Sequence, residues 1–226
     1  MRIAPIIPVV LAAALLAAAP VRAESPEGYN PGSVPRVSFG FGGGYGWHSL
    51  HNGSSSGPGK VTGSEMYTGG LIFEGMISEH MGLHSGVWYL RERMRFDSMP
   101  GAKVTSEGTG LAIPVLAVFP FHAWRFTLDF LAGIQFTLMT SSRYTIAQPG
   151  PNMDFDVLKF LNYQQLGVAG GVDLKIAFFR FVDFFVAAIG EYNLTTFSSE
   201  SSEGVADHLY GYVIRTGFLF RTYHIF

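Results

Sequence analysis

The sequence predicts an all-β protein: an eight-stranded antiparallel up-and-down transmembrane β-barrel that follows a cleaved N-terminal signal peptide. Three observations support this fold class. Hydrophobic residues make up 48% of the 226 residues, and charged residues only 14%. After the N-terminal segment, no uncharged apolar run reaches the roughly 18 residues of a membrane-spanning helix. Eight segments instead alternate between two kinds of residue, because successive side chains of a strand point to opposite faces.

The N-terminal segment has the layout of a secretory signal peptide. Arg2 supplies a positive charge, an apolar run follows over residues 6–19, and Val21 and Ala23 are small residues at a cleavage point. The alternative, an uncleaved membrane anchor, would need a longer apolar run. We expect cleavage after Ala23. The chain then divides into a signal peptide (residues 1–23), a periplasmic leader (residues 24–34) and the barrel (residues 35–226).

The eight strands follow one another along the chain. They are predicted at residues 37–47, 67–77, 83–92, 109–119, 124–138, 165–176, 182–195 and 209–226. The first alternates aromatic residues with glycines, which would leave room inside for neighbouring side chains. The fourth contains Pro114, which removes a ladder hydrogen bond and weakens this strand. The last ends on Phe226, and we expect it to close the barrel by pairing with the first.

The connections alternate between long and short. Long polar loops are predicted at residues 48–63, 97–108, 141–159 and 198–207, and short turns at residues 78–81, 120–123 and 178–180. Bacterial outer-membrane barrels have short periplasmic turns and longer extracellular loops. The alternation therefore favours this class over a water-soluble sandwich. It places the four long loops outside the cell, where they could contact an extracellular ligand.

The two faces of the strands differ in charge. In the last four strands the apolar face has no Asp, Glu, Lys or Arg, as a lipid-facing wall requires. Aromatic residues gather toward the strand ends, as interfacial girdles do. The other face carries the charges that we expect in the lumen: Arg36, Glu74, Glu92, Arg125, Asp129, Asp173, Lys175, Asp183, Glu191, Arg215 and Arg221.

An eight-stranded barrel has an interior about wide enough for side chains to fill it. The predicted lumen charges are five basic and six acidic, and Trp88 and Phe185 share their face. Buried charges are tolerated when they are paired. We therefore expect an occluded interior in which Arg215 and Arg221 pair with inward acids. A narrow or gated path through a rearranging charge network stays open as an alternative.

The composition argues against nucleic-acid, metal and cofactor sites. Without Arg2 and Arg22 the 15 basic residues fall to 13, against 17 acidic ones, and no basic cluster is present. The chain has no cysteine, and its seven histidines lack a metal-ligand spacing. The glycine-rich GFGGGYG segment lacks the helix and lysine of a phosphate-binding loop. We expect no catalytic, metal-binding or cofactor-binding residue.

The pattern resembles the small outer-membrane β-barrel family, the OmpA/OmpX-like and porin-like group with an outer membrane protein beta-barrel domain. The segments SFGFGGGYGW, IPVL and LAGIQF and the terminal aromatic residue carry this resemblance. It implies a protein of the cell outer membrane, surrounded by lipid. It also implies that Phe218, Phe220 and Phe226 form a signal for the barrel-assembly machinery, although His224 stands where an aromatic residue is commoner.

Three functions are compatible with these observations. We expect an integral outer-membrane barrel with a structural or surface role and no enzymatic activity. A small-solute porin or channel is the first alternative. The second is a lipid-modifying enzyme, because His48 and His51 lie close in sequence to Ser54–Ser56 and could form a His–Ser pair.

Overall fold

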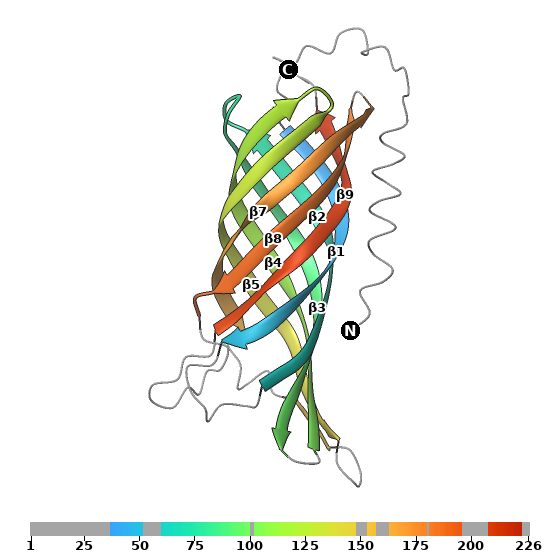
Figure 1. Ribbon diagram of the computed structural model, residues 1–226, viewed down its shortest axis with the longest axis vertical. Helices are drawn as coiled ribbons and strands as arrows, with labels where there is room; N and C mark the ends of the chain where they lie inside the picture. Colours follow the sequence, from blue (N-terminus) through green and yellow to red (C-terminus); the bar gives the residue numbers. More distant parts are fainter. Residues whose placement is uncertain are drawn as a thin grey trace. The chain divides into compact units, whose positions relative to one another are not determined.

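The computed structural model describes residues 37–51, 60–99, 102–147, 153–156, 163–179, 181–195 and 208–222. Within these ranges the chain forms one β-sheet that closes into a barrel (Figure 1). Its strands are β1 (Val37–His51), β2 (Lys60–Met76), β3 (Gly82–Met99), β4 (Ala102–Ala123), β5 (Phe126–Ala147), β6 (Met153–Asp156), β7 (Gln164–Phe179), β8 (Val182–Asn193) and β9 (His208–Thr222). No helix in the described ranges is long and apolar enough to cross a membrane.

Eight of the strands form the wall of the barrel. They pair antiparallel in the order β4-β3-β2-β1-β9-β8-β7-β5, and the pairing of β4 with β5 closes the ring. The four-residue β6 is not part of this wall and pairs with the loop end of β5. The last strand, β9, pairs with β1 along its whole length, from Val37–Thr222 to His51–His208. The predicted eight-stranded antiparallel barrel is confirmed.

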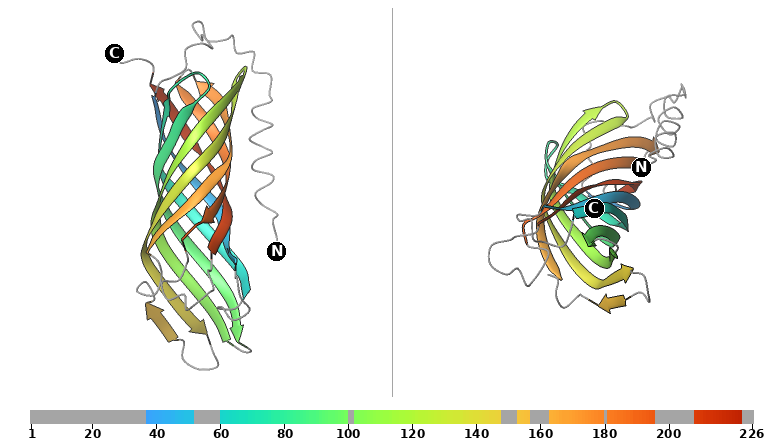
Figure 2. Two further views of the ribbon diagram at one scale, coloured as in Figure 1. Left: turned by 90° about the vertical axis from the view of Figure 1, so that its left-hand side faces the viewer. Right: turned by 60° about the horizontal axis from the view of Figure 1, so that its bottom comes forward.

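The two ends of the barrel differ. At the turn end, short connections join β2 to β3, β4 to β5 and β7 to β8. At the loop end, β2, β3, β4 and β5 continue beyond the other strands as a protruding sheet that includes β6 (Figure 1, Figure 2). The turn end lies at the top of Figure 1 and the protruding sheet at the bottom.

One circuit of the barrel shifts the register by ten residues. The ladder partners run from Phe39 through Phe73, Ser85, Val115, Ile134, Val168, Tyr192 and Tyr210 back to Ser49. For eight strands this shear corresponds to a strand tilt of about 40° from the barrel axis. Because the shift is an even number of residues, every side chain keeps its face around the ring.

Inward and outward side chains alternate in burial along the wall. In β9, inward Val213 and Leu219 are no more than 1% exposed, whereas outward Tyr212 is 46% exposed. The outward face is apolar, with Tyr67 and Tyr89 toward the loop end and Trp124 at the turn end. The core of this protein is therefore the lumen of the barrel, and the outer wall is an exposed apolar surface that needs lipid to cover it.

Inward glycines of β1 make room for side chains from neighbouring strands. A Cβ at Gly42 would lie 2.9 Å from Cζ of Phe185 and 2.6 Å from the backbone oxygen of Thr216. A Cβ at Gly44 would lie 3.0 Å from Cγ of Arg215. Large side chains of β8 and β9 thus lie across β1, which is the arrangement predicted for the inward glycines of the first strand.

The strands are longer than predicted, so three predicted loops shrink. The loop predicted at residues 97–108 is wrong, because β3 continues to Met99 and β4 begins at Ala102. The loops predicted at residues 48–63 and 141–159 lose residues to the strands on either side. Residues 97–108 include Asp, Gly and Lys, which are depleted in strands, but ladder pairing with a neighbouring strand overrides that preference. The loop at residues 198–207, the signal peptide and the leader lie outside the described residues.

The β4–β5 turn is displaced from the predicted position. Residues 120–123 belong to β4, and the turn is formed by Trp124 and Arg125. Trp124 has a φ of 56°, the left-handed conformation that two-residue hairpin turns use. Its side chain is 74% exposed and adds an aromatic ring to the turn end.

Pro114 interrupts the ladder between β3 and β4 without ending the strand. The paired residues stop at Ser85–Val115 and resume at Trp88–Ala112, so two rungs are missing opposite Pro114. The hydroxyl of Ser85 donates a hydrogen bond of 2.9 Å to the carbonyl oxygen of Pro114. On its other side Pro114 keeps its register with β5.

We predict that Gly42→Ala destabilises the barrel and that Gly43→Ala does not. The added methyl group at Gly42 collides with the backbone of β9 and with Phe185, which costs on the order of 2 kcal/mol. Gly43 faces outward, where a Cβ would have only an ordinary 3.5 Å contact with the oxygen of Thr68. Urea unfolding in lipid vesicles, followed by tryptophan fluorescence, measures both. Equal unfolding midpoints would contradict the packing role of Gly42.

Candidate functional site in the barrel lumen

Buried charged residues form two clusters in the lumen, one toward each end. The turn-end cluster consists of Glu74, His84, Asp129 and Lys175, and the loop-end cluster of His48, Glu92, Glu191 and Arg215. Seven of the eight wall strands supply one or two of these residues each, and β4 supplies none, so neither cluster is local in sequence. Both are built by the closure of the sheet.

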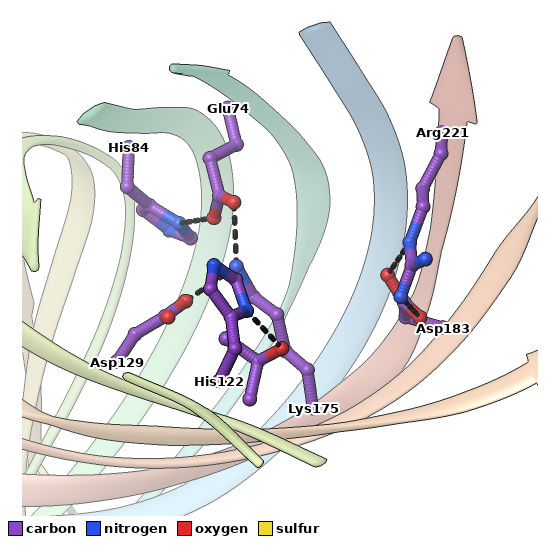
Figure 3. Close-up of polar contacts among 8 residues, drawn as sticks. Glu74, His84, His122, Asp129, Lys175, Asp183 and Arg221 are labelled. Atoms are coloured by element: carbon purple, nitrogen blue, oxygen red, sulfur yellow. Dashed lines mark hydrogen bonds and ion pairs between the residues drawn. The ribbon is translucent and has the colours of Figure 1, made fainter. Parts of the chain in front are cut away.

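Lys175 is the centre of the turn-end cluster. Its Nζ lies 2.5 Å from Oε1 of Glu74 and 2.5 Å from Oδ2 of Asp129 (Figure 3). His84 places its Nδ1 3.4 Å from Oε2 of Glu74. Because β7 and β2 are four positions apart in a ring of eight strands, the contact between Lys175 and Glu74 crosses the lumen. The side chains of all these residues are 8% exposed or less.

A second ion pair lies beside the turn-end cluster. Arg221 of β9 donates to both carboxylate oxygens of Asp183 in β8, with Nε 2.5 Å from Oδ2 (Figure 3). Asp173 faces Asp129 directly across the β5–β7 ladder and is 1% exposed. Acids therefore outnumber lysine and arginine at this end, and Lys175 holds the central acids together.

The loop-end cluster is organised around two glutamates. His48 places Nδ1 3.1 Å from Oε1 of Glu92 and Nε2 3.5 Å from Oε2 of Glu191. Arg215 donates from Nη2 to Oε1 of Glu191 at 3.0 Å, and Gln135 donates to its Oε2 at 2.9 Å. Glu191 thus accepts hydrogen bonds from two other strands and lies beside His48 of a third, which fixes its carboxylate in the lumen.

Aromatic side chains fill the space beside these clusters. The guanidinium carbon of Arg215 lies 4.5 Å from the ring centroid of Trp88, a cation–π contact between β9 and β3. Trp88 is 1% exposed and Phe185 is 2% exposed. Since Asp129 at one end and Arg215 toward the other are also at most 3% exposed, solvent does not reach the inward side chains between the two clusters.

The structure brings most of the predicted lumen charges together. Nine of the eleven lie in the lumen: Glu74, Glu92, Asp129, Asp173, Lys175, Asp183, Glu191, Arg215 and Arg221. Both β9 arginines pair with acids of the neighbouring strand β8, as inward arginines were expected to do. Arg36 lies outside the described residues.

Arg125 was predicted in the lumen, and that prediction is wrong. It is a turn residue at the rim, with its guanidinium carbon 5.4 Å from the ring centroid of Trp124. The reason is that β4 is longer than predicted, so the reversal of the chain falls on Arg125 itself. Of the assembly-signal residues, Phe218 and Phe220 belong to β9, where Phe218 is 39% exposed on the outward face. Phe226 lies outside the described residues.

Sequence reasoning missed the two lumen histidines. His48 was assigned to the first loop, but β1 extends past it and its side chain is buried between two glutamates. His84 falls in the strand predicted at residues 83–92 and was given no role. The alternation of the strands could have revealed both. His48 lies an even number of residues from the inward glycines of its strand, and His84 an even number from Trp88 and Glu92, so each shares their inward face.

The described residues offer little for catalysis or metal binding. His51 ends β1 opposite His208, and Ser54–Ser56 lie outside the described residues. Within the described ranges, no group of three or more His, Cys, Asp or Glu side chains is arranged to hold a metal ion. What the lumen residues do chemically is neutralise one another and exclude water, because each cluster joins opposite charges across a barrel that side chains fill.

Comparison with known proteins agrees with this architecture. Residues 29–199 match the family model described as outer membrane protein beta-barrel domain. No curated protein is significantly similar in sequence.

Three solved structures illustrate the likeness of fold. Neisserial surface protein A is 11% identical, with 81% of this chain and 97% of that chain covered and a TM-score of 0.43. Ail of Yersinia pestis is 13% identical, with coverage of 82% and 99% and a TM-score of 0.42. OprG of Pseudomonas aeruginosa is 12% identical, with coverage of 83% and 96% and a TM-score of 0.45. At these identities the likeness says nothing about function.

We predict that Lys175→Met is strongly destabilising and that neutralising its partners restores stability. Methionine leaves the carboxylates of Glu74 and Asp129 buried without their cation, which costs roughly 3–5 kcal/mol. In the triple variant Lys175→Met/Glu74→Gln/Asp129→Asn the buried charges are gone, and most of the loss should be recovered. Urea unfolding midpoints in vesicles measure both. A single variant as stable as the wild type would show that the cluster is not stabilised by Lys175.

Proposed function

The chain belongs to the outer membrane protein beta-barrel domain family, and on that premise we propose that it is a non-enzymatic outer-membrane barrel whose lumen is closed to solutes. One observation carries the proposal: the inward side chains are buried from the turn-end cluster to the loop-end cluster. In a water-filled pore the lumen residues would be exposed to solvent, as charged pore linings are. Here a charged Lys175 is 6% exposed and Arg215 is 3% exposed.

The energetics of the two clusters support a closed lumen. Opening a path would require Lys175 to leave Glu74 on the opposite wall, and Arg215 to leave both Glu191 and the ring of Trp88. Separating a buried ion pair leaves each charge without compensation and is costly. The alternative of a small-solute channel therefore requires a coordinated rearrangement of several strands' side chains.

A barrel with a closed lumen can have a structural or surface role. Barrels of this class place their longer connections outside the cell. The protruding sheet at the loop end holds a small inward apolar cluster of Met94, Phe96 and Leu209, against which Val104 and Tyr144 pack. Burial raises the pKa of the Tyr144 phenol above its ordinary value, so Tyr144 stays neutral there. The base of the sheet is thus packed against Leu209 of β9, which fixes the surface that the sheet presents to an extracellular ligand.

The outward face of β9 supports a second part of the proposal, recognition by the barrel-assembly machinery. Phe218 and Phe220 belong to the last strand and pack against Phe39 and Phe41 of β1 across the seam. Before closure these rings have no partner on β1 and are available to another protein. We expect Phe226→Ala to slow assembly catalysed by that machinery while unassisted refolding into thin vesicles keeps its rate. Equal slowing of both reactions would exclude a recognition role.

Conductance in planar bilayers tests the closed lumen. The refolded wild-type protein is expected to give no discrete current steps, because no water-filled path crosses the side-chain layer. The double variant Trp88→Ala/Phe185→Ala removes the two inward aromatic rings that pack beside the charged clusters and should conduct. The matched control Val87→Ala/Phe184→Ala changes their outward neighbours and should not. Discrete steps from the wild type would establish a pore and overturn the proposal.

A lipid-turnover assay tests the non-enzymatic part. Vesicles containing labelled phospholipid or lipid A, incubated with the refolded protein, are expected to keep their lipid composition. Turnover that disappears in His51→Ala or Ser54→Ala would establish the lipid-modifying alternative. Turnover that survives both substitutions would point to a contaminant, and the proposal would stand.

A further inference from the structure

The outer wall changes from apolar to charged within one step along the strands at the loop end. Across β3, β4 and β5, the ladder row Tyr89–Leu111–Leu138 is apolar. The next outward row on β2 to β5 is Tyr67–Arg91–Thr109–Ser141. The row after that alternates in charge from β2 to β6, as Glu65–Arg93–Glu107–Arg143–Asp156. The edge of the lipid-facing band on this side therefore lies level with Tyr67 and Arg91.

Three arginines of β3 stand at and above this edge. Arg91, Arg93 and Arg95 are alternate residues on the outward face, with side chains 65%, 49% and 54% exposed. We call them the arginine belt. Alternate residues are about 7 Å apart along a strand, and a tilt of about 40° makes each step about 5 Å in height. The belt therefore spans about 10 Å above the tyrosines, the layer that lipid headgroups occupy.

Glu65 and Glu107 face the three belt arginines and offset part of their charge. Oε1 of Glu107 lies 3.1 Å from Nε of Arg93, and its Oε2 lies 3.9 Å from Nη2 of Arg91, so one glutamate faces two arginines. Glu65 lies 3.7 Å from Arg95. Exposed ion pairs of this kind contribute little and exchange partners readily. A phosphate group accepts paired hydrogen bonds from a guanidinium and is the stronger partner.

From this placement we propose that the arginine belt binds the phosphate groups of an anionic lipid headgroup in the outer leaflet. The fork of a guanidinium fits phosphate oxygens, and the belt faces away from the barrel at headgroup height, beside Tyr67 and Tyr89. A lipid with two phosphates on one headgroup can contact two arginines, because neighbouring belt residues are about 7 Å apart. The inference uses the membrane position of the barrel and is independent of whether its lumen conducts.

Native mass spectrometry of the refolded protein with a bis-phosphorylated glycolipid tests the proposal. The wild type should retain the glycolipid, and Arg91→Gln/Arg93→Gln/Arg95→Gln should bind it at least tenfold more weakly, because each arginine near an anionic surface contributes on the order of tenfold or less. Arg125→Gln, at the opposite rim, is the matched control and should bind like the wild type. Glu107→Gln releases two arginines and should bind more tightly. Equal retention by the wild type and the triple variant would overturn the proposal.

Two further measurements fix the source of the phosphate. Phosphatidylcholine, which has no net charge, should give no difference between the wild type and the triple variant. Inorganic pyrophosphate added in excess should displace the glycolipid only weakly, because it gains nothing from the adjacent apolar wall. Complete displacement by pyrophosphate would assign the belt to soluble phosphate compounds and refute a lipid ligand. A urea midpoint equal to that of the wild type shows that the triple variant is folded.

Discussion

Closure of the sheet between β1 and β9 is the constraint on which the rest of the structure depends. It joins the first and last strands of the barrel over their whole length and removes the exposed edges that an open sheet would present to lipid. It also places Arg215 and Phe185 against the inward glycines of β1. A larger residue at those glycines would collide with the neighbouring backbone. The side chains that fill the lumen therefore require glycine at the inward positions of the first strand.

The contents of the lumen follow from its width. With eight strands there is no room for both side chains and a column of water, so inward charges are compensated by other inward residues. The two clusters solve this in different ways. Lys175 is one cation shared by two acids, whereas Glu191 is one acid that accepts from Arg215 and Gln135 and lies beside His48. Among the residues that the structure describes, charges on the outer wall appear only where the lipid-facing band ends.

The sequence predicts the fold well and the contacts of the lumen less well, for physical reasons. Alternation in β5 and β9 is a property of each strand alone, so it can be found without the structure. Strand length depends on whether a neighbour offers a ladder, which is why the loop predicted at residues 97–108 and the turn predicted at residues 120–123 are misplaced. Which inward residues meet depends on the ten-residue shift of the whole ring. No single segment reveals that Lys175 reaches Glu74 across the lumen.

The ion pairs of the lumen have one more consequence, which concerns selection among alternative registers. An apolar wall alone tolerates a slip of β9 against β1 by two residues, since every side chain would keep its face. After such a slip, with β8 and β9 still paired as before, Arg215 would no longer lie beside Gly44, and His48 of β1 would shift away from Glu191 of β8. The buried charges therefore discriminate against near-correct barrels that hydrophobicity cannot distinguish. The buried charges thus favour the correct register when β9 pairs with β1 and closes the barrel.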